Sequence, residues 1–311
     1  MRKTFAIALA LIVGAGPLFA AEGALNGKFS VNAKGQTVQF AKGNLQYQAS
    51  TKTWRLAANQ WTVIGDDNAK VAPDFAGWID LFGWGTGNNP TLATKNDSDY
   101  VGSKATFKDW SKNAISNGGN KANLWRTLTK DEWVYILFTR PNADKLFGLG
   151  SVNGINGTIL LPDNWALPAG AKFVPNTTKG LANKGDFYKM ETQESIYAPN
   201  TYTVEQWKVL EAAGAVFLPA GGSRYGDKVK DVNVKGEYWT STLHDEYTDG
   251  GFYLVFTTKS IGPKNYCTCV QGNTIRPVIS EAANAPAARP APTKQTPPAG
   301  KQTPPSKNAK R

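Results

Sequence analysis

The chain has 311 residues, of which 41% are hydrophobic and 10 are tryptophan, so it can build a substantial core. Its formal net charge of +11 is concentrated at the ends, since residues 1–20 contribute +2 and residues 282–311 contribute +6. The +3 that remains is spread over the residues between them, which argues against nucleic-acid binding by the folded part.

The first twenty residues have the three parts of a secretory signal. A basic pair at Arg2 and Lys3 precedes an apolar run from Phe5 to Val13, and small residues follow at Ala20. A buried or anchoring helix is the alternative, but a core helix rarely follows such a basic pair. No stretch reaches the roughly 18 apolar residues of a membrane span. We therefore expect a removed signal peptide at 1–20, no transmembrane span, and export to the periplasm, the cell surface or the medium.

Short strands separated by Gly, Asn and Asp turns are expected next. Between Thr37 and Gln48, apolar and polar residues alternate in places, which indicates strand, and Lys42–Gly43 interrupts the alternation. Residues 83–123 and 163–200 lack such patterns and predict long, structured loops. Further strands are expected at 53–56, 60–64, 157–161, 215–219, 238–241, 251–257 and 274–279.

Two helices are predicted by matching capping boxes. Thr129 is followed at the third position by Glu132, and Thr203 is followed by Gln206 in the same way. Trp133 and Trp207 stand at the fifth position of each pattern and are expected to anchor these short helices in the core.

The only two cysteines, Cys267 and Cys269, stand two residues apart, and His244 is the only histidine. On a strand the two thiols would point the same way but lie too far apart for an easy bridge. A metal site would normally add a second pair or more histidines. We expect two semi-buried thiols, with a strained or intermolecular disulfide as the alternative, and no cofactor and no metal.

The amino-acid composition of the chain changes after Ser280. Residues 282–311 contain seven prolines, no aromatic residue, and the sequence KQTPP at 294–298 and again at 301–305. Such a segment buries too little to offset its ordering entropy, so a disordered tail is predicted after a single domain at 21–281. The tail is a solvated spacer or an arm that contacts anionic envelope polymers.

Several motifs resemble those of one protein family. WRTLTKDEW at 125–133, GEYWTST at 236–242, GGFYLVF at 250–256 and GNTIRPVI at 272–279 are similar, in this order, to motifs of the formylglycine-generating-enzyme-like branch of the C-type lectin fold. QFAKGNLQYQ and WIDLFGWGT resemble the N-terminal half of Bacteroidetes surface proteins in the same branch, which includes the bacterial major paralogous domain proteins. The resemblance covers about residues 28 to 280.

The resemblance implies a C-type-lectin-like α+β domain with two short helices, small twisted sheets and long structured loops. Trp125, Trp239 and Arg276 would then be structural. Arg276 precedes a proline in an apolar strand, so its guanidinium needs a buried acceptor.

In this fold, ligands are commonly bound by the C-terminal strands and loops, so a non-enzymatic binding protein is the first functional hypothesis. Tyrosine, asparagine, aspartate and histidine there suit stacking on sugar rings or peptides and hydrogen bonding to polar groups. An extracellular glycan or protein is the expected ligand. The candidate ligand-binding residues are Arg224, Tyr225, His244, Asp245, Tyr247, Tyr253, Asn265 and Tyr266, with Glu246 and Lys264 beside them.

Calcium-dependent sugar binding of the animal-lectin kind is not supported, because its motifs are absent and LPDNW at 161–165 is expected to be a turn.

Two other hypotheses, an enzyme and a structural component, have less support than a binding protein. An oxidase of the formylglycine-generating type would need two cysteines in another motif and at a wider spacing, and one histidine offers no Ser/His/Asp set. A glycosidase-like carboxylate pair stays open, because such pairs meet only in three dimensions. A structural or adhesive envelope component, with the tail as a spacer, is the remaining alternative.

Overall fold

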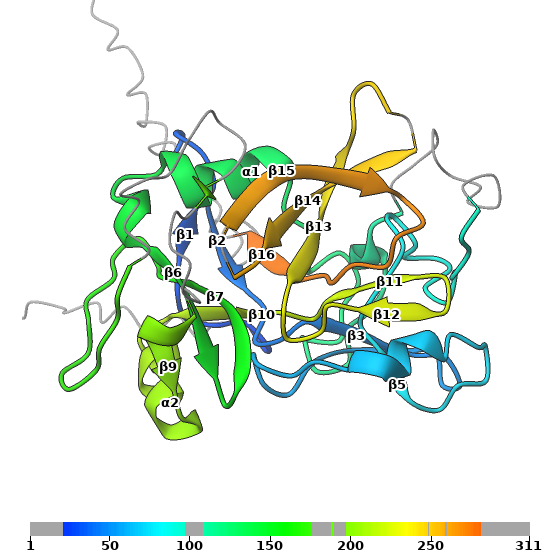
Figure 1. The fold of residues 1–311 in the computed structure, drawn as a ribbon, viewed down its shortest axis with the longest axis horizontal. Helices are drawn as coiled ribbons and strands as arrows, with labels where there is room; N and C mark the ends of the chain where they lie inside the picture. Colours follow the sequence, from blue (N-terminus) through cyan, green and yellow to red (C-terminus); the bar gives the residue numbers. More distant parts are fainter. Residues whose placement is uncertain are drawn as a thin grey trace, which may run out of the picture.

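The computed structural model describes residues 21–96, 108–175, 188–189, 197–247, 249–258 and 260–280. The expected signal peptide and tail lie outside these residues. Figure 1 shows few short helices and several small sheets, which confirms the α+β class. Within the described part of the chain, no helix has the length and apolar character to cross a membrane.

The strands are short and form five small sheets in the described residues. In chain order they are β1 (Phe29–Ser30), β2 (Thr37–Phe40), β3 (Leu45–Gln48), β4 (Thr53–Leu56), β5 (Trp78–Ile79), β6 (Phe147–Val152), β7 (Ile155–Leu160), β8 (Tyr188–Lys189), β9 (Thr201–Tyr202), β10 (Val216–Pro219), β11 (Ser223–Tyr225), β12 (Lys228–Lys230), β13 (Gly236–Leu243), β14 (Gly250–Phe256), β15 (Ser260–Thr268) and β16 (Val278–Ser280).

Two α-helices accompany them, α1 (Lys130–Val134) and α2 (Val204–Ala212). A π-helical turn, η4 (Tyr135–Thr139), continues α1. Short 3-10 turns make up the rest: η1 (Gly65–Ala69), η3 (Trp110–Lys112), η5 (Ala143–Lys145) and η6 (Ala198–Asn200).

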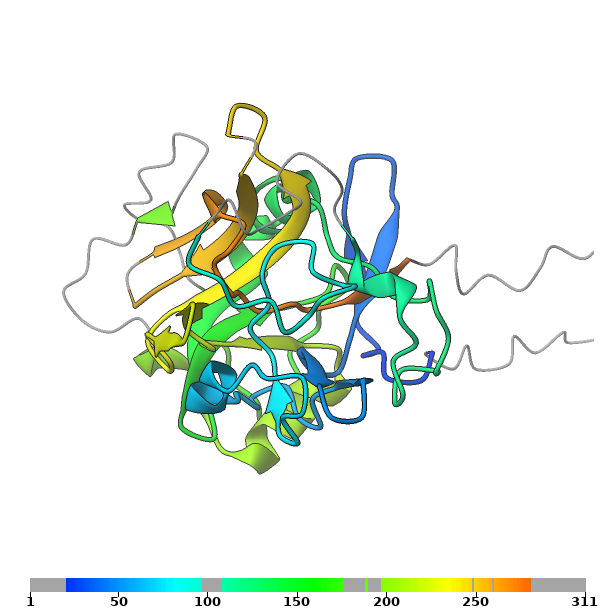
Figure 2. The same cartoon turned by 90° about the vertical axis from the view of Figure 1, so that its right-hand side faces the viewer.

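One sheet joins the two ends of the domain. Strand β2 pairs with β1 on one side and with β16 on the other, and Val278 of β16 lies opposite Phe40. Figure 2 shows the β1–β2 hairpin standing at one side of the molecule. The next hydrogen-bonded sheet, β4–β3–β5, follows directly in the chain, and Tyr47 and Trp54 pack there with ring centroids 4.6 Å apart.

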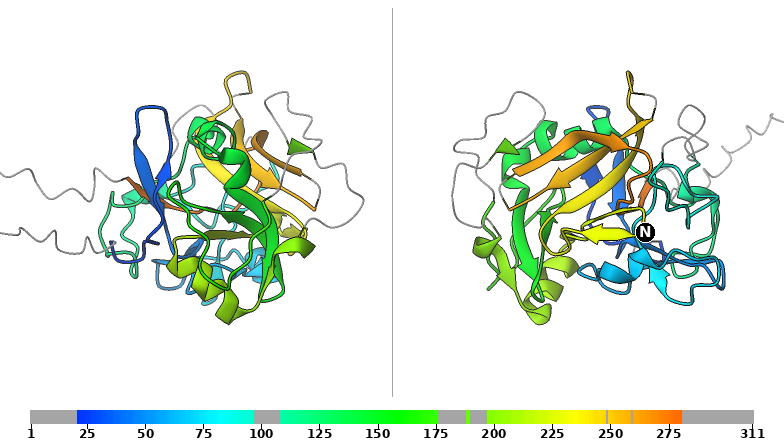
Figure 3. Two further views of the ribbon diagram at one scale, coloured as in Figure 1. Left: turned by 90° about the vertical axis from the view of Figure 1, so that its left-hand side faces the viewer. Right: turned by 45° about the vertical axis from the view of Figure 1, so that its right-hand side comes forward.

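A second unit is built on the β6–β7 hairpin. Asn153 and Gly154 have φ angles of 52° and 78°, the left-handed pair that a tight two-residue hairpin turn requires. Strand β10 extends the hairpin antiparallel to β7, and β9 pairs parallel with β6. Helix α2 packs beside this sheet (Figure 3), with Trp207 at 5.5 Å from Phe217.

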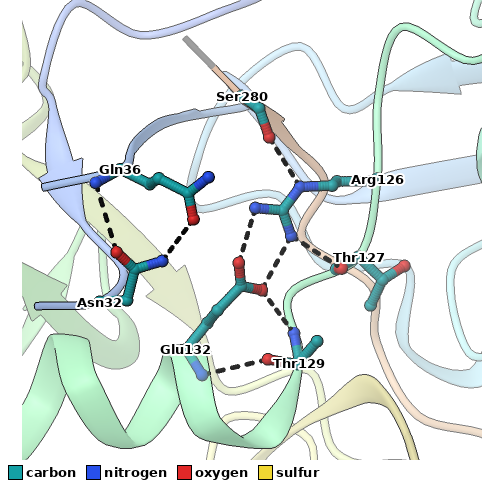
Figure 4. A network of polar contacts seen from close by, with 7 residues as sticks. All are labelled: Asn32, Gln36, Arg126, Thr127, Thr129, Glu132 and Ser280. Carbon is teal, nitrogen blue, oxygen red and sulfur yellow. Dashed lines mark hydrogen bonds and ion pairs between the residues drawn. The ribbon is translucent and has the colours of Figure 1, made fainter. Parts of the chain in front are cut away.

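Both predicted capping boxes are present. Thr129 and Glu132 cap α1 reciprocally, and Thr203 and Gln206 do the same for α2. At α1 the cap is reinforced, because Arg126 bonds both carboxylate oxygens of Glu132 at 2.7 and 2.8 Å. Arg126 Nε also donates to Ser280 Oγ at 2.8 Å (Figure 4), which ties the helix to the end of β16.

The core contains the tryptophans expected to be structural. Trp125, Trp133, Trp207 and Trp239 are all at most 2% exposed. Arg276 is buried as well and has the acceptors it was expected to need, since it donates to Asn44 Oδ1 and to the carbonyls of Ala41 and Phe217.

Most of the expected strands are confirmed, with limits shifted by a few residues. The strand expected at 60–64 was wrong: Gln60 and Trp61 lie in a turn, and residues 62–64 have no regular secondary structure. Gln60 is buried, and its side chain accepts from Phe217 N–H at 2.7 Å. Of 274–279 only the end is strand, in β16. The LPDNW segment is a turn, as expected, and Asp163 in it accepts hydrogen bonds from Arg140 and from Ser30 N–H.

Candidate functional site

The sheet β13–β14–β15–β8 presents two different faces. Trp239 lies opposite Tyr253, and Gly251 lies opposite Cys267, so these side chains share the face that meets the tryptophan-rich core. Phe252 lies opposite Tyr266 and points to the other face. That second face, at the end of the sheet where β13 turns into β14, carries the candidate site.

Four aromatic side chains gather there, and we call them the aromatic cluster: His244, Tyr247, Phe252 and Tyr266. The rings of Tyr247 and Tyr266 are stacked, with centroids 5.2 Å apart and an angle of 11°. The imidazole of His244 lies 4.3 Å from the ring of Tyr266, 4.8 Å from that of Tyr247 and 4.8 Å from that of Phe252. Phe252 is buried at 8% exposure, whereas Tyr247 and Tyr266 are 50% and 48% exposed. The cluster is therefore rooted in the sheet and open to solvent at its tyrosines.

The turn that carries Tyr247 is held by His244. Its Nδ1 atom accepts the backbone N–H groups of Glu246 and Tyr247, each at 3.1 Å. The main chain adds bonds from His244 N–H to Gly250 O and from Gly250 N–H to Tyr247 O, both 2.8 Å. Figure 1 shows this turn projecting from the body beyond the ends of β13 and β14. The projection is thus ordered by its own hydrogen bonds and by ring stacking.

Charged groups of both signs border the cluster. Lys130, the first residue of α1, places its Nζ 4.4 Å from the centroid of Phe252 and 3.9 Å from Asp131 Oδ1. Asp245 and Glu246 are exposed on the turn, and Asp249 is half-buried. The neighbouring Tyr247 is the main cause that raises the pKa of Tyr266, so its hydroxyl remains a donor at neutral pH.

The arrangement offers two kinds of contact to a ligand. Two half-exposed phenol rings offer flat apolar faces together with hydroxyl donors, the combination that binds sugar rings and extended peptides. Within the described residues, no group of three or more His, Cys, Asp or Glu side chains could hold a metal ion.

No family model, no curated protein and no solved structure matches this chain.

The structure brings together three of the predicted ligand-binding residues, His244, Tyr247 and Tyr266, with Asp245 beside them on the turn. The others lie elsewhere. Tyr225 is 41% exposed on the separate β11–β12 hairpin, where its hydroxyl donates to Lys95 O at 2.8 Å. Asn265 is half-buried and donates to Gly262 O at 3.2 Å.

Arg224 corrects the expectation of a surface residue. It is fully buried, and its guanidinium donates to the carbonyl oxygens of Gly226, Leu81 and Leu92 at 3.0 to 3.3 Å. Burial lowers the pKa of Arg224 to about 10. A side chain surrounded by main-chain acceptors is a structural one, because it satisfies carbonyls that would otherwise be buried without donors.

Tyr253 also faces inward. Its ring meets Trp239 edge-on at 5.9 Å, and burial together with the nearby Glu237 raises its pKa. It lies on the opposite face of the sheet from Tyr266, so it belongs to the core side and not to the aromatic cluster.

Two members of the site, Phe252 and Lys130, were not among the predicted residues. Phe252 stands next to Tyr253 in an apolar strand, and the alternation of β14 puts the two on opposite faces. That alternation was the signal that could have selected Phe252 together with Tyr266. Lys130 is far away in the chain and reaches the cluster only because α1 packs beside β14.

The cysteines lie apart from the cluster and do not form a nucleophilic centre. Neither is in a disulfide; Cys267 is half-buried and Cys269 is buried. Burial is the main cause that raises the pKa of Cys267, and the carboxylate of Glu237 adds to it. The thiol therefore stays protonated at neutral pH and is a poor nucleophile.

A separate pocket of about 260 Å³ lies between α2 and the preceding loop. It is lined by residues 169–172, Tyr202, Gln206, Val209 and Leu210. The hydroxyl of Tyr202 already donates to Lys172 O at 2.8 Å, and no titratable cluster faces the pocket in the described residues that line it. We therefore place the candidate site at the aromatic cluster.

Proposed function

We propose that this protein is an exported, non-enzymatic binding protein with a C-type-lectin-like fold, and that it binds an extracellular glycan through the aromatic cluster. The observation that carries the proposal is the stacked, half-exposed pair Tyr247–Tyr266. His244 packs against the ring of Tyr266 and stacks on the buried ring of Phe252.

The rigidity of the pair supports a binding role. An aromatic platform that is already ordered loses little conformational entropy when a ligand stacks on it. A phenol ring offers an apolar face to the C–H groups of a sugar, while its hydroxyl, the Nε2 side of His244 and the exposed Asp245 offer hydrogen bonds to sugar hydroxyls. The stack joins Tyr247 of the projecting turn to Tyr266 of β15, and both rings are about half exposed, so they lie at the surface and not in the core.

The fold assignment rests on the sequence resemblance and on compatible features of the domain. These are the small β13–β14–β15 sheet, the buried Trp239, and a closing segment in which Arg276 and Pro277 precede β16. Export rests on the N-terminal sequence alone.

The absence of enzymatic activity is part of the proposal. The neighbouring Tyr247 raises the pKa of the Tyr266 hydroxyl, so this group is a poor nucleophile at neutral pH. The Cys267 thiol, whose pKa is raised by burial, lies on the other face of the sheet. Among the described residues, the two tyrosine rings of the cluster are about half exposed to water, whereas a reacting bond is usually shielded from it.

A glycan array probed with residues 21–311 tests the proposal. We expect binding to a defined group of glycans, and a loss of about ten-fold in affinity, roughly 1.4 kcal/mol, when Tyr247→Ala or Tyr266→Ala removes one ring. Tyr225→Ala is the matched control, because Tyr225 is a similarly exposed tyrosine on another hairpin.

Glycan binding that survives both cluster variants would place the site elsewhere. Attachment only to cells or to further copies of the chain, with no glycan bound, would favour the structural or adhesive alternative.

A further inference from the structure

We infer that the aromatic cluster is also the docking site of the chain's own basic, proline-rich C-terminal segment, residues 281–311. The cluster and the acidic turn around it form the surface, and the segment is its occupant within the same molecule. The inference does not depend on which external ligand the cluster binds.

The chemistry of the turn selects a cationic partner. Residues 244–249 carry three carboxylates, Asp245, Glu246 and Asp249, and no lysine or arginine. Asp131, at the start of α1, adds a fourth carboxylate that is 87% exposed. Two cations lie nearer to the sheet: Lys130 over Phe252, and Lys264, two residues before Tyr266 in β15. The outer side of the cluster, at Tyr247, is therefore its acidic side.

The exposed rings select a partner that stacks. Lysine and arginine groups are attracted to the faces of tyrosine rings, and proline-rich segments bind on aromatic surfaces because their polyproline II conformation costs little entropy to fix. A segment that alternates cations with prolines would use both the rings and the carboxylates.

Residues 281–311 have this composition. They carry six cations and one acid, Glu281, and the sequence KQTPP occurs twice. Each repeat places a lysine, Lys294 or Lys301, three residues before a proline pair. In a polyproline II conformation, which rises about 3.1 Å per residue, each repeat would hold its cation about 10 Å from its prolines, so the two can contact different groups of the surface.

The position where the described chain ends makes the contact reachable. Ser280 is bonded by Arg126, which pairs with Glu132 in α1 (Figure 4), and Lys130 at the start of the same helix lies over Phe252. Helix α1 has five residues and is thus only about 7 Å long. From Ser280 to Pro297 an extended chain can span about 50 Å, which is several times the length of α1.

Because the segment belongs to the same chain as the cluster, even a weak contact between them can be well populated. A short covalent connection gives an effective concentration in the millimolar range. A contact with a dissociation constant of about 100 µM between separate molecules would then be occupied about nine-tenths of the time within one chain.

The test titrates a fluorescent synthetic peptide of residues 281–311 into two proteins, residues 21–280 and residues 21–311. The three hydrophobic clusters of the core consist of residues between Ala21 and Ile279, so the shorter chain retains the complete core. We expect saturable binding to residues 21–280 with a dissociation constant near 100 µM, and about ten-fold weaker binding to residues 21–311, whose own segment competes.

Variants locate the contact. Tyr247→Ala should weaken peptide binding to residues 21–280 at least five-fold, and the double variant Asp245→Asn with Glu246→Gln should weaken it and reduce its salt dependence. Tyr247→Phe keeps the ring and should bind as the parent does, and Tyr225→Ala should have no effect. Circular dichroism of each variant confirms that the fold is retained.

Three results would overturn the inference. They are the absence of saturable binding to residues 21–280, binding that Tyr247→Ala leaves unchanged, and equal affinity for the two proteins. The last result would show that the segment does not occupy the cluster of its own chain.

Discussion

The Nδ1 atom of His244 accepts the backbone N–H of Tyr247 at 3.1 Å, so a side chain at the end of β13 fixes the main chain beneath the exposed tyrosine. The same imidazole stacks on Phe252 with an interplanar angle of 18°. His244 thus has two separable roles: it accepts hydrogen bonds from the turn, and it supports the rings.

Two variants of His244 should separate these roles. His244→Asn retains a side-chain acceptor for the turn and loses the ring, whereas His244→Phe retains the ring and loses the acceptor. We expect amide hydrogen exchange of Glu246 and Tyr247 to accelerate about ten-fold in the Phe variant, because about 1.4 kcal/mol of hydrogen bonding is lost, and less in the Asn variant. Equal exchange in both variants would contradict a role for Nδ1.

Asp80 predicts how stability depends on pH. It is fully buried, accepts from Asn68 Nδ2 at 2.8 Å, and burial raises its pKa to about 6. Since the folded state binds this proton more tightly than the unfolded state, its contribution to stability is complete below about pH 4. That contribution is lost as the pH rises through about 6, and it amounts to about 3 kcal/mol.

Asp80→Asn should remove this dependence. We expect the difference in free energy of unfolding between the parent and Asp80→Asn, measured by urea titration at pH 4 to 8, to shift in favour of the variant as the pH rises. Asp74→Asn, at an exposed position, is the control and should follow the parent. A constant difference between pH 4 and pH 8 would refute the assignment to Asp80.

The Arg126–Glu132 pair should contribute through both charge and cap. Glu132 accepts from Arg126 and from Thr129 N–H at 2.8 Å, and its side chain is 17% exposed. Glu132→Gln can keep the cap bond to Thr129 and should lower the free energy of unfolding by about 1 kcal/mol. Glu132→Ala loses the cap bond and the ion pair with Arg126 and should lower it by about 2 to 3 kcal/mol. Chemical unfolding measures both values.

A double-mutant cycle with Arg126→Ala isolates the pair, and we expect a coupling energy of about 1 kcal/mol. Additive effects would show that Arg126 acts only through Ser280.

Arg276 should tolerate no apolar replacement. Its guanidinium is buried and bonds Asn44, Ala41 and Phe217 at 2.8 to 3.0 Å, so Arg276→Met leaves several buried acceptors without donors. We expect a loss of about 3 to 5 kcal/mol in the free energy of unfolding, with Arg276→Lys intermediate because one ammonium cannot reach every acceptor. A loss below about 1 kcal/mol would contradict this reading of the core.

Features that depend on neighbouring residues were predictable from the sequence. The capping boxes at Thr129 and Thr203 are present because each needs only four consecutive residues. The tryptophans placed at the fifth position of each pattern are buried for the same local reason, since the first helical turns fix which side faces the core.

Features that depend on distant partners were missed. Strand β15 contains Gly262 and Pro263, a pair typical of a turn, yet it pairs along β14 because the register shifts there: Tyr253 lies opposite Asn265, and Val255 opposite Gly262. A bulge of this kind tolerates a residue without an N–H. No local pattern shows where a partner strand will admit it.

The site was predicted in part for similar reasons. His244, Tyr247 and Tyr266 stand out by residue type, and the hairpin brings them together. Arg224 stands beside an exposed tyrosine but is enclosed by carbonyls of residues 81 and 92, more than a hundred positions earlier in the chain. Its burial depends on contacts that composition cannot reveal.

The pairing of β2 with β16 has a consequence for the order of folding. Strand β2 has β1 beside it from the start, but its second partner, β16, is made more than two hundred residues later, so the sheet that joins the two ends of the domain is completed late in synthesis. Until then Phe40 and its neighbours lack the strand that completes their side of the core. Late closure of this sheet would suit the proposed export, because a chain whose core is still incomplete can pass through a narrow translocation channel.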